Sequence, residues 1–296
     1  METCAVEIKQ WMIINKLKFN DDKTEFLIIG NPQQRLKVSL PSLSVGDVPI
    51  APTTECRNLG VIIDNSMTMD KQVSAMCKSI SFHLRNISKI RKYLTDSSAA
   101  SLVHALISSR LDYCNSLLYK IPKFQIKRLQ LLQNTAARIV TGTPKYHHIT
   151  PVLKQLHWLP VESRIKYKIL LMVYKSLTGT APSYLWETLY HPGRTLRSSD
   201  KTLLVVPKTD QCAGERTFAV AGPRLWNELP ASIRNRPSLD SFKTALKVAL
   251  VKLPYFNKET WSSHFNGPYY SYFQKYFCKT IYFWNGQSLV ILNTLK

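Results

Sequence analysis

The chain has 296 residues, of which 45% are hydrophobic, so a buried core is within reach and two domains are expected. Its 40 Lys and Arg exceed its 19 Asp and Glu, which gives a formal net charge of +21. Because such an excess repels itself, it usually matches a polyanion; nucleic acid is the first class of partner, and an anionic membrane surface is the second. No run of about 18 apolar residues is present, and the N-terminus lacks the basic region of a secretory signal. We therefore expect no membrane-spanning helix.

The cysteines follow no metal-binding spacing. No pair has the Cys-x-x-Cys form, which argues against a zinc finger or knuckle. Six cysteines allow three disulfides, but several fall inside apolar helical patterns, where buried reduced thiols are the simpler interpretation. We therefore expect an intracellular protein of the cytoplasm or nucleus. The six are Cys4, Cys56, Cys77, Cys114, Cys212 and Cys278.

The first sixty-odd residues mix a helix with strands. Residues 5–16 have the apolar spacing of a short amphipathic helix, and residues 18–30 indicate a turn followed by a strand. Residues 36–63 read as a β-meander, with alternation at Leu36–Leu40 and a buried last strand at Leu59–Ile63. Helical periodicity replaces strand periodicity after Asp64.

Three helices are predicted next. Residues 67–94 place seven apolar side chains within about 80° on one face of a helix, and five cations within about 60° on the opposite face. A turn at 95–98 ends in an N-cap, and a second helix spans 99–118 until Ile121-Pro122 breaks it. A third helix spans 123–140 and stops at Gly142. The apolar set is Val73, Met76, Ile80, Leu84, Ile87, Ile90 and Leu94.

The following region is predicted as mixed. Thr150-Pro151 suits the start of a helix over 152–157, and a corner at 158–160 leads into a long helix over 162–177. Two short strands, Leu203–Val206 and Thr217–Val220, precede a turn at 221–223 and a last helix at 238–252. The fold class expected from the whole pattern is α+β and mainly α.

Seven short motifs occur in order over residues 10–256. Together they resemble the C-terminal part of a reverse transcriptase from non-LTR (LINE-type, jockey-like) retrotransposons. The resemblance implies a remnant palm at 1–65, a helical thumb-like region at 66–145, a small mixed domain at 146–256 and an aromatic-rich tail at 257–296 outside the ancestral domain. The motifs are Asn20-x-x-Lys23-Thr24-Glu25, Arg57-Asn58-Leu59-Gly60-Val61, Ser109–Asn115, Leu129–Arg138, Leu156–Pro160, Arg216-x-Phe218 and Trp226-Asn227-x-Leu229-Pro230.

The resemblance implies an RNA-directed DNA polymerase whose aspartates, in a Tyr/Phe-x-Asp-Asp turn, hold two Mg²⁺ ions across the reacting phosphate. The only tetrapeptide of this form, Phe19-Asn20-Asp21-Asp22, overlaps the Asn20-x-x-Lys23 motif, and Asp21-Asp22 reads as a turn rather than a metal site. We therefore expect this chain alone to bind no cofactor and to be inactive as a polymerase. Lys23 matches a palm lysine that would act as an ancestral general acid. The alternatives are a pseudogene relic or a host-adopted RNA-binding module.

The strongest functional signal is local charge. Residues 71–150 contain thirteen Lys or Arg but only Asp96 and Asp112 as acids, so i,i+4 ion pairs are scarce. A solvated helix face is the alternative, but we favour RNA, an RNA/DNA hybrid or a DNA duplex bound by its backbone. No small-molecule ligand and no oligomeric state is indicated. The predicted contact residues are Arg57, Asn58, Lys71, Lys78, Arg85, Lys89, Lys92, Lys123, Lys127 and Arg138.

Overall fold

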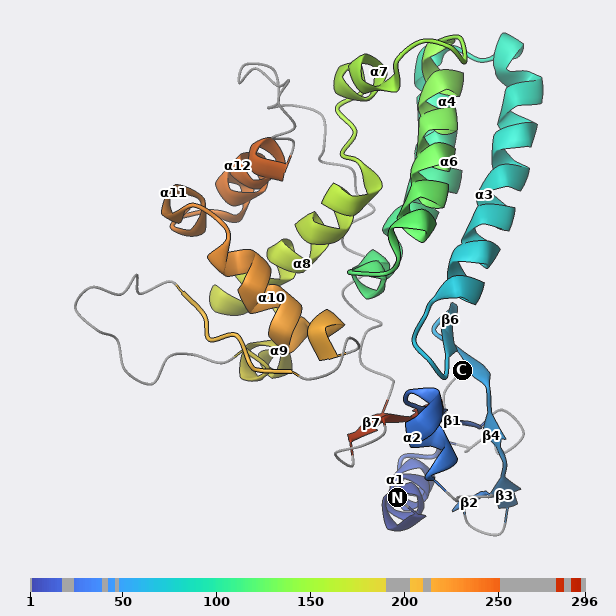
Figure 1. Ribbon diagram of the computed structural model, residues 1–296, viewed down its shortest axis with the longest axis vertical. Coiled ribbons are helices and arrows are strands. Elements are labelled where there is room, and N and C mark those ends of the chain that lie inside the picture. Colours follow the sequence, from blue (N-terminus) through green and yellow to red (C-terminus); the bar gives the residue numbers. More distant parts are fainter. Residues whose placement is uncertain are drawn as a thin grey trace. The chain divides into compact units, whose positions relative to one another are not determined.

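The computed structural model describes residues 2–17, 24–38, 42–45, 48–189, 203–209, 214–250, 281–284 and 289–293 (Figure 1). The chain forms two compact units, one made of residues 1–72 with 265–296 and the other of residues 73–264. Most described residues are helical and strands are few, which confirms the predicted α+β, mainly α class. None of the helices within these ranges is long and apolar enough to cross a membrane.

The first unit is built on a four-stranded sheet in the order β4-β1-β8-β7. The central strand β1 runs parallel to β4, with Phe26 opposite Pro52, and antiparallel to β8, with Phe26 opposite Leu292. Phe26 and Leu27 are completely buried and anchor this sheet. The elements are α1 (Glu2–Ile14), β1 (Glu25–Ile29), α2 (Pro32–Leu36), β2 (Leu43–Val45), β3 (Val48–Ile50), β4 (Pro52–Thr53), β5 (Glu55–Asn58), β6 (Val61–Asp64), β7 (Ile281–Trp284) and β8 (Leu289–Asn293).

One sequence expectation for this unit is wrong. Leu36 does not begin a strand but ends α2, because Asn31 and Gln34 form a reciprocal capping box and Pro32 takes the first helical turn. The tail beyond residue 257 contributes β7 and β8, and β8 pairs with β1. Strand pairing across more than 200 residues cannot be read from local periodicity.

The buried strand predicted at 59–63 is the second half of a hairpin. β5 and β6 pair antiparallel, with Cys56 opposite Ile63. Leu59 (φ 45°) and Gly60 (φ 82°) make the two-residue turn between them, since this kind of turn needs positive φ at both positions. The strand therefore starts at Val61, and only Val61 and Ile63 point into the core.

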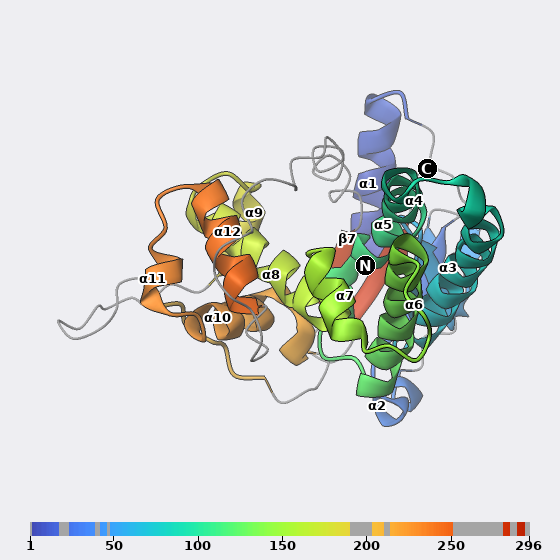
Figure 2. The same cartoon turned by 90° about the horizontal axis from the view of Figure 1, so that it is seen from above.

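The second unit begins with a layer of long helices. Figure 2 shows α3, α4 and α6 side by side, nearly end-on. The predicted apolar stripe of α3 is buried from Val73 to Ile87, whereas Ile90 is exposed and Leu94 only half-buried, because the α-helix ends at Ile90. The elements are α3 (Asp70–Ile90), the 3-10 helix η2 (Arg91–Tyr93), α4 (Asp96–Val103), the π-helical segment η3 (His104–Ser108), α5 (Ser109–Asp112), the 3-10 helix η4 (Asn115–Leu118), α6 (Lys123–Thr141) and α7 (Ile149–Gln155).

The helix boundaries in this layer follow capping residues. Thr95 accepts a hydrogen bond from the Ser98 amide at 3.2 Å, so α4 starts at Asp96 rather than 99. The second predicted helix is interrupted at Cys114, which has a φ of 48°. Gly142 ends α6 with a φ of 67°, as its residue type predicts. α7 starts at Ile149, after His148 rather than Thr150.

The remaining helices surround α8. α10 and α12 pack on α8, and the Tyr174 ring stacks on Phe242 with a centroid distance of 4.2 Å. The Trp226 ring is tilted against Phe242 with a centroid distance of 5.9 Å, and all three rings are buried. The elements are α8 (Val161–Leu177), α9 (Ser183–Glu187), the 3-10 helix η5 (Gly214–Arg216), α10 (Phe218–Asn227), α11 (Ala231–Arg234) and α12 (Leu239–Leu250).

The two strands and the turn predicted for residues 203–223 are wrong. Residues 203–209 are irregular, and Leu204 is fixed by two hydrogen bonds to the Asn227 side chain, at 3.0 and 2.8 Å. Phe218 starts α10, and Gly222 and Pro223 lie inside it. A Cβ on Gly222 would come within 2.9 Å of a Val173 methyl group of α8. Close helix packing therefore overrides the local turn preference of Ala-Gly-Pro.

Candidate nucleic-acid interface

One face of α3 and η2 carries a continuous row of cations, here named the basic ridge. Its members are Lys78, Arg85, Lys89 and Lys92. All four side chains are exposed, and within the part of the chain that the structure describes none of them pairs with a carboxylate. The ring of Phe82 is 54% exposed in the same row. The ridge therefore offers positive charge and one apolar ring to solvent.

The ridge is fixed because the opposite face of α3 is core. Val73, Ile80 and Ile87 are almost completely buried, which sets the rotation of the helix about its axis. From Lys78 to Lys92 the helical rise of 1.5 Å per residue spans about 21 Å. That length passes about six phosphates of one duplex strand at 3.4 Å each. The geometry suits several adjacent phosphates rather than a single anion.

The predicted contact residues on α6 differ in exposure and in the groups that they contact. Lys123 and Lys127 are exposed and have no acidic partner among the described residues. Arg138 is half-buried, and its Nη2 donates to the His147 carbonyl at 3.1 Å. Arg138 therefore holds the loop after α6, and the prediction that it contacts phosphate is corrected.

Two predicted contacts in the first unit are also corrected. Lys71 forms an ion pair with Glu55, with 2.6 Å between Nζ and Oε2, so it is not an uncompensated cation. Asn58 is 6% exposed and belongs to the hairpin core, so its side chain cannot reach a ligand at the surface. Arg57 is exposed, and its backbone amide donates to Glu25. Lys23, the candidate general acid, lies outside the described residues.

Asp64 is a structural residue that the sequence pattern did not single out. Its Oδ1 accepts from the amides of Ser66 and Thr68 at 3.1 and 2.9 Å, and its Oδ2 accepts from the Met69 amide at 2.8 Å. These bonds fix the turn that leads into α3. An Asp a few residues before a helical pattern is the available signal, since such side chains hydrogen-bond to nearby amides.

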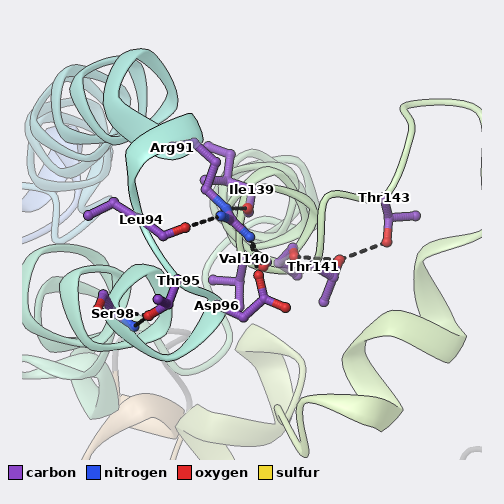
Figure 3. Close-up of polar contacts among 10 residues, drawn as sticks. Arg91, Leu94, Thr95, Asp96, Ser98, Ile139, Val140, Thr141 and Thr143 are labelled. Carbon is purple, nitrogen blue, oxygen red and sulfur yellow. Dashed lines mark hydrogen bonds and ion pairs between the residues drawn. The ribbon is translucent and has the colours of Figure 1, made fainter.

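Arg91 precedes Lys92 in the sequence but does not belong to the basic ridge. Its guanidinium donates to the carbonyls of Ile139 and Val140 at 2.7 and 2.9 Å, to the Leu94 carbonyl at 2.8 Å, and to the Asp96 carboxylate (Figure 3). Arg91 thus satisfies carbonyls at the end of α6 and ties that end to η2. Nothing in the local sequence separates it from the cations around it.

The Ser109–Asn115 motif forms an internal polar cluster. Arg164 of α8 pairs with Asp112, with 2.6 Å between Nη1 and Oδ2, and its Nε donates to the Leu159 carbonyl at 3.0 Å. Burial lowers the pKa of Lys168 and raises the pKa of Cys114, and these two groups lie close enough to interact. Burial therefore disfavours the thiolate form of Cys114.

The described residues contain no group of three or more His, Cys, Asp or Glu side chains placed to hold a metal ion. Histidines 147 and 148 are exposed beside Tyr146 and form no such group. No known protein family, curated protein or solved structure matches the chain. The basic ridge and the exposed lysines of α6 are therefore assigned as the candidate interface from their charge and exposure alone.

Proposed function

We propose that the helical unit binds nucleic acid through its phosphate backbone, along the basic ridge. The observation that carries the proposal is that four cations share one exposed helix face without a carboxylate partner in the described ranges. Placing like charges together costs stability unless an external anion neutralises them. Lys123 and Lys127 on α6 would add further contacts, and Phe82 would touch sugar or base.

The wider proposal is that the chain is part of an RNA-directed DNA polymerase of a LINE-type mobile element. The ordered series of motifs and the presence of a long cationic helix after β6 support it. In this interpretation the ridge would hold an RNA, RNA/DNA or DNA duplex inside a cell, and the intact family enzyme would use Mg²⁺. This chain alone would bind without polymerising, because its one Asp-Asp pair, Asp21-Asp22, reads as a turn rather than as the metal-binding pair.

The test compares two triple substitutions that remove the same charge. The ridge variant carries Lys78→Gln, Arg85→Gln and Lys89→Gln. The matched control carries Lys120→Gln, Lys166→Gln and Lys243→Gln, whose lysines pair with carboxylates. Affinity for a labelled RNA/DNA duplex is measured over a series of salt concentrations by fluorescence anisotropy.

We expect the ridge variant to flatten the slope of log affinity against log salt by about 2 to 3, because each phosphate contact contributes about 0.9. The control should change the slope by less than about 1. Equal slopes for the two variants would reject the ridge as the interface. A wild-type slope near zero would reject nucleic-acid binding altogether.

A further inference from the structure

The ends of α3 and α6 meet at one end of the helical unit (Figure 1). Arg91 joins them by donating to the Ile139 and Val140 carbonyls (Figure 3). Two segments more than forty residues apart, η2 and the loop after Gly142, are thereby anchored to the same point. We name the exposed residues of these two segments the tip: Lys92, Tyr93, Lys145, Tyr146, His147 and His148.

The tip exposes two tyrosine rings. Tyr93 is 77% exposed and Tyr146 is 84% exposed, so neither ring contributes to the core. The Lys92 Nζ lies over the Tyr93 ring, 4.8 Å from its centroid. The His147 ring meets the Tyr146 ring edge to face at 5.1 Å. Each aromatic face therefore stands next to a group that can contact a phosphate or a base.

The loop that carries Tyr146 is held in place by polar contacts. The Arg138 guanidinium donates to the His147 carbonyl at 3.1 Å, and the His147 amide donates to the Pro144 carbonyl at 3.3 Å. The hydroxyls of Thr141 and Thr143 hydrogen-bond at 2.7 Å beside the Gly142 cap. Ordering of a binding loop before the ligand arrives lowers the entropic cost of binding.

The charge of the tip suits an anion. Residues 142–150 contain Lys145 and no Asp or Glu, and the nearest acid in sequence to Tyr93 is Asp96, which Arg91 already engages. A positively charged surface with exposed aromatic faces is the combination that binds unpaired nucleotides, because every base has a face that stacks. A base-paired duplex hides these faces inside its own stack.

We propose that the tip binds single-stranded nucleic acid by stacking unpaired bases on Tyr93 and Tyr146, with Lys92 and Lys145 at the adjacent phosphates. The proposal extends the proposed function, since it gives the same unit a second site that takes bases rather than backbone. It assigns the ridge to the phosphates of a duplex and the tip to an overhanging or unpaired strand.

The test uses the full chain and two labelled probes of equal length. One is an oligouridylate of about 12 nucleotides, and the other is the same ribose-phosphate chain without bases. Binding is measured by fluorescence anisotropy for the wild type, for Tyr93→Ala with Tyr146→Ala, and for Tyr93→Phe with Tyr146→Phe. Tyr184→Ala, a partly exposed tyrosine of α9, is the matched control.

We expect the double alanine variant to lose about tenfold or more in affinity for oligouridylate and less than about twofold for the abasic chain. The phenylalanine variant and the Tyr184 control should bind both probes within about twofold of the wild type, since a phenyl ring also stacks. Equal losses for the two probes, or no loss for either, would overturn the proposal.

This outcome is separable from that of the proposed function. The ridge variant should weaken binding of the RNA/DNA duplex and leave the preference for oligouridylate over the abasic chain unchanged, because it removes only phosphate contacts. If the ridge variant binds the duplex normally while the tyrosine variant loses its preference for bases, the tip proposal is supported and the ridge proposal is rejected. A wild type that binds both probes equally well overturns the tip and leaves the ridge test unaffected.

Discussion

The two halves of the helical unit differ in whether their cations pair with carboxylates. Around α8 to α12, Lys120, Arg164, Lys166, Arg224 and Lys243 each lie within 3.3 Å of a carboxylate oxygen. Along α3, the basic ridge has no carboxylate partner within the described ranges. Part of the net charge of the chain is thus left uncompensated on one helix face.

This difference separates cations that stabilise the fold from cations that are available to a ligand. Paired cations on α8 connect elements that are distant in sequence, such as Asp112 and Arg164. Among the residues that the structure describes, the ridge cations form no ion pair, and Arg85 donates to the Ser81 carbonyl of its own helix. Substitutions should therefore lower stability in one half and binding in the other.

The largest expected effect on stability comes from Asp112→Ala. The side chain of Arg164 is only 10% exposed, so its guanidinium would lose its carboxylate while it remains buried. We expect the free energy of unfolding to fall by about 3 kcal/mol, measured by urea denaturation. Asp96→Ala is the control, because that carboxylate is 82% exposed and its loss should cost below about 1 kcal/mol. Equal losses for the two variants would contradict the distinction between buried and exposed pairs.

Arg91→Met tests the one ridge-side cation that we assign to the fold. The substitution leaves the Ile139, Val140 and Leu94 carbonyls without their donor. We expect a loss of about 2 kcal/mol in the free energy of unfolding, together with faster amide exchange at the end of α6. The neighbouring Lys92→Met should change stability by less than about 0.5 kcal/mol, because Lys92 is exposed. If Lys92→Met cost as much as Arg91→Met, the division between structural and available cations would fail.

The sequence predicted the long helices best. α3 and α6 each repeat apolar residues with a helical period, and Gly142 ends α6 where its residue type predicts an end. The turn predicted from the Ala-Gly-Pro segment is wrong because Gly222, which has no Cβ, lets α10 pack closely against Val173 of α8. The preferences of residue types describe the backbone conformation of one segment, whereas this contact depends on how two helices pack against each other.

The candidate interface was predictable in part for a related reason. Helical periodicity correctly placed Lys78 and Lys89 on the exposed face. It failed for Lys71, whose partner Glu55 comes from the preceding hairpin, and for Arg138, whose partner is the following loop. Exposure follows from periodicity, but the identity of a charged partner does not.

A smaller effect is expected from the pH dependence of the paired half. Hydrogen bonds from Lys120 and Arg224 hold the pKa of Glu215 below its ordinary value. A depressed carboxyl pKa stabilises the fold above the unfolded pKa, near 4.3, and this contribution is lost as the pH falls through the lower folded value. The Tm difference between the wild type and Glu215→Gln should therefore be largest above about pH 5 and shrink in acid. Glu187→Gln, at an exposed position of α9, should show no such trend, and a parallel trend in both would contradict the assignment.

The smallest effect tests the comparison most directly, because the two halves should respond to the same substitution with opposite signs. Lys166→Gln removes an ion pair with Glu162 at 3.0 Å and should lower the free energy of unfolding by about 0.3 to 0.5 kcal/mol. Lys89→Gln removes repulsion from Arg85, four residues before it, and Lys92, three residues after it, so it should raise stability by a few tenths of a kcal/mol.

Gln and Lys have similar helix propensities, so backbone preference cancels between the two variants. Both differences should shrink in about 1 M salt, where charges more than about 3 Å apart are screened. The comparison is made by chemical denaturation with urea, which leaves the ionic strength unchanged. A loss of stability in Lys89→Gln equal to that in Lys166→Gln would mean that the ridge contributes to the fold after all. A gain at low salt that disappears at high salt would show that the ridge cations repel one another in the free protein, and that a polyanion is what their arrangement lacks.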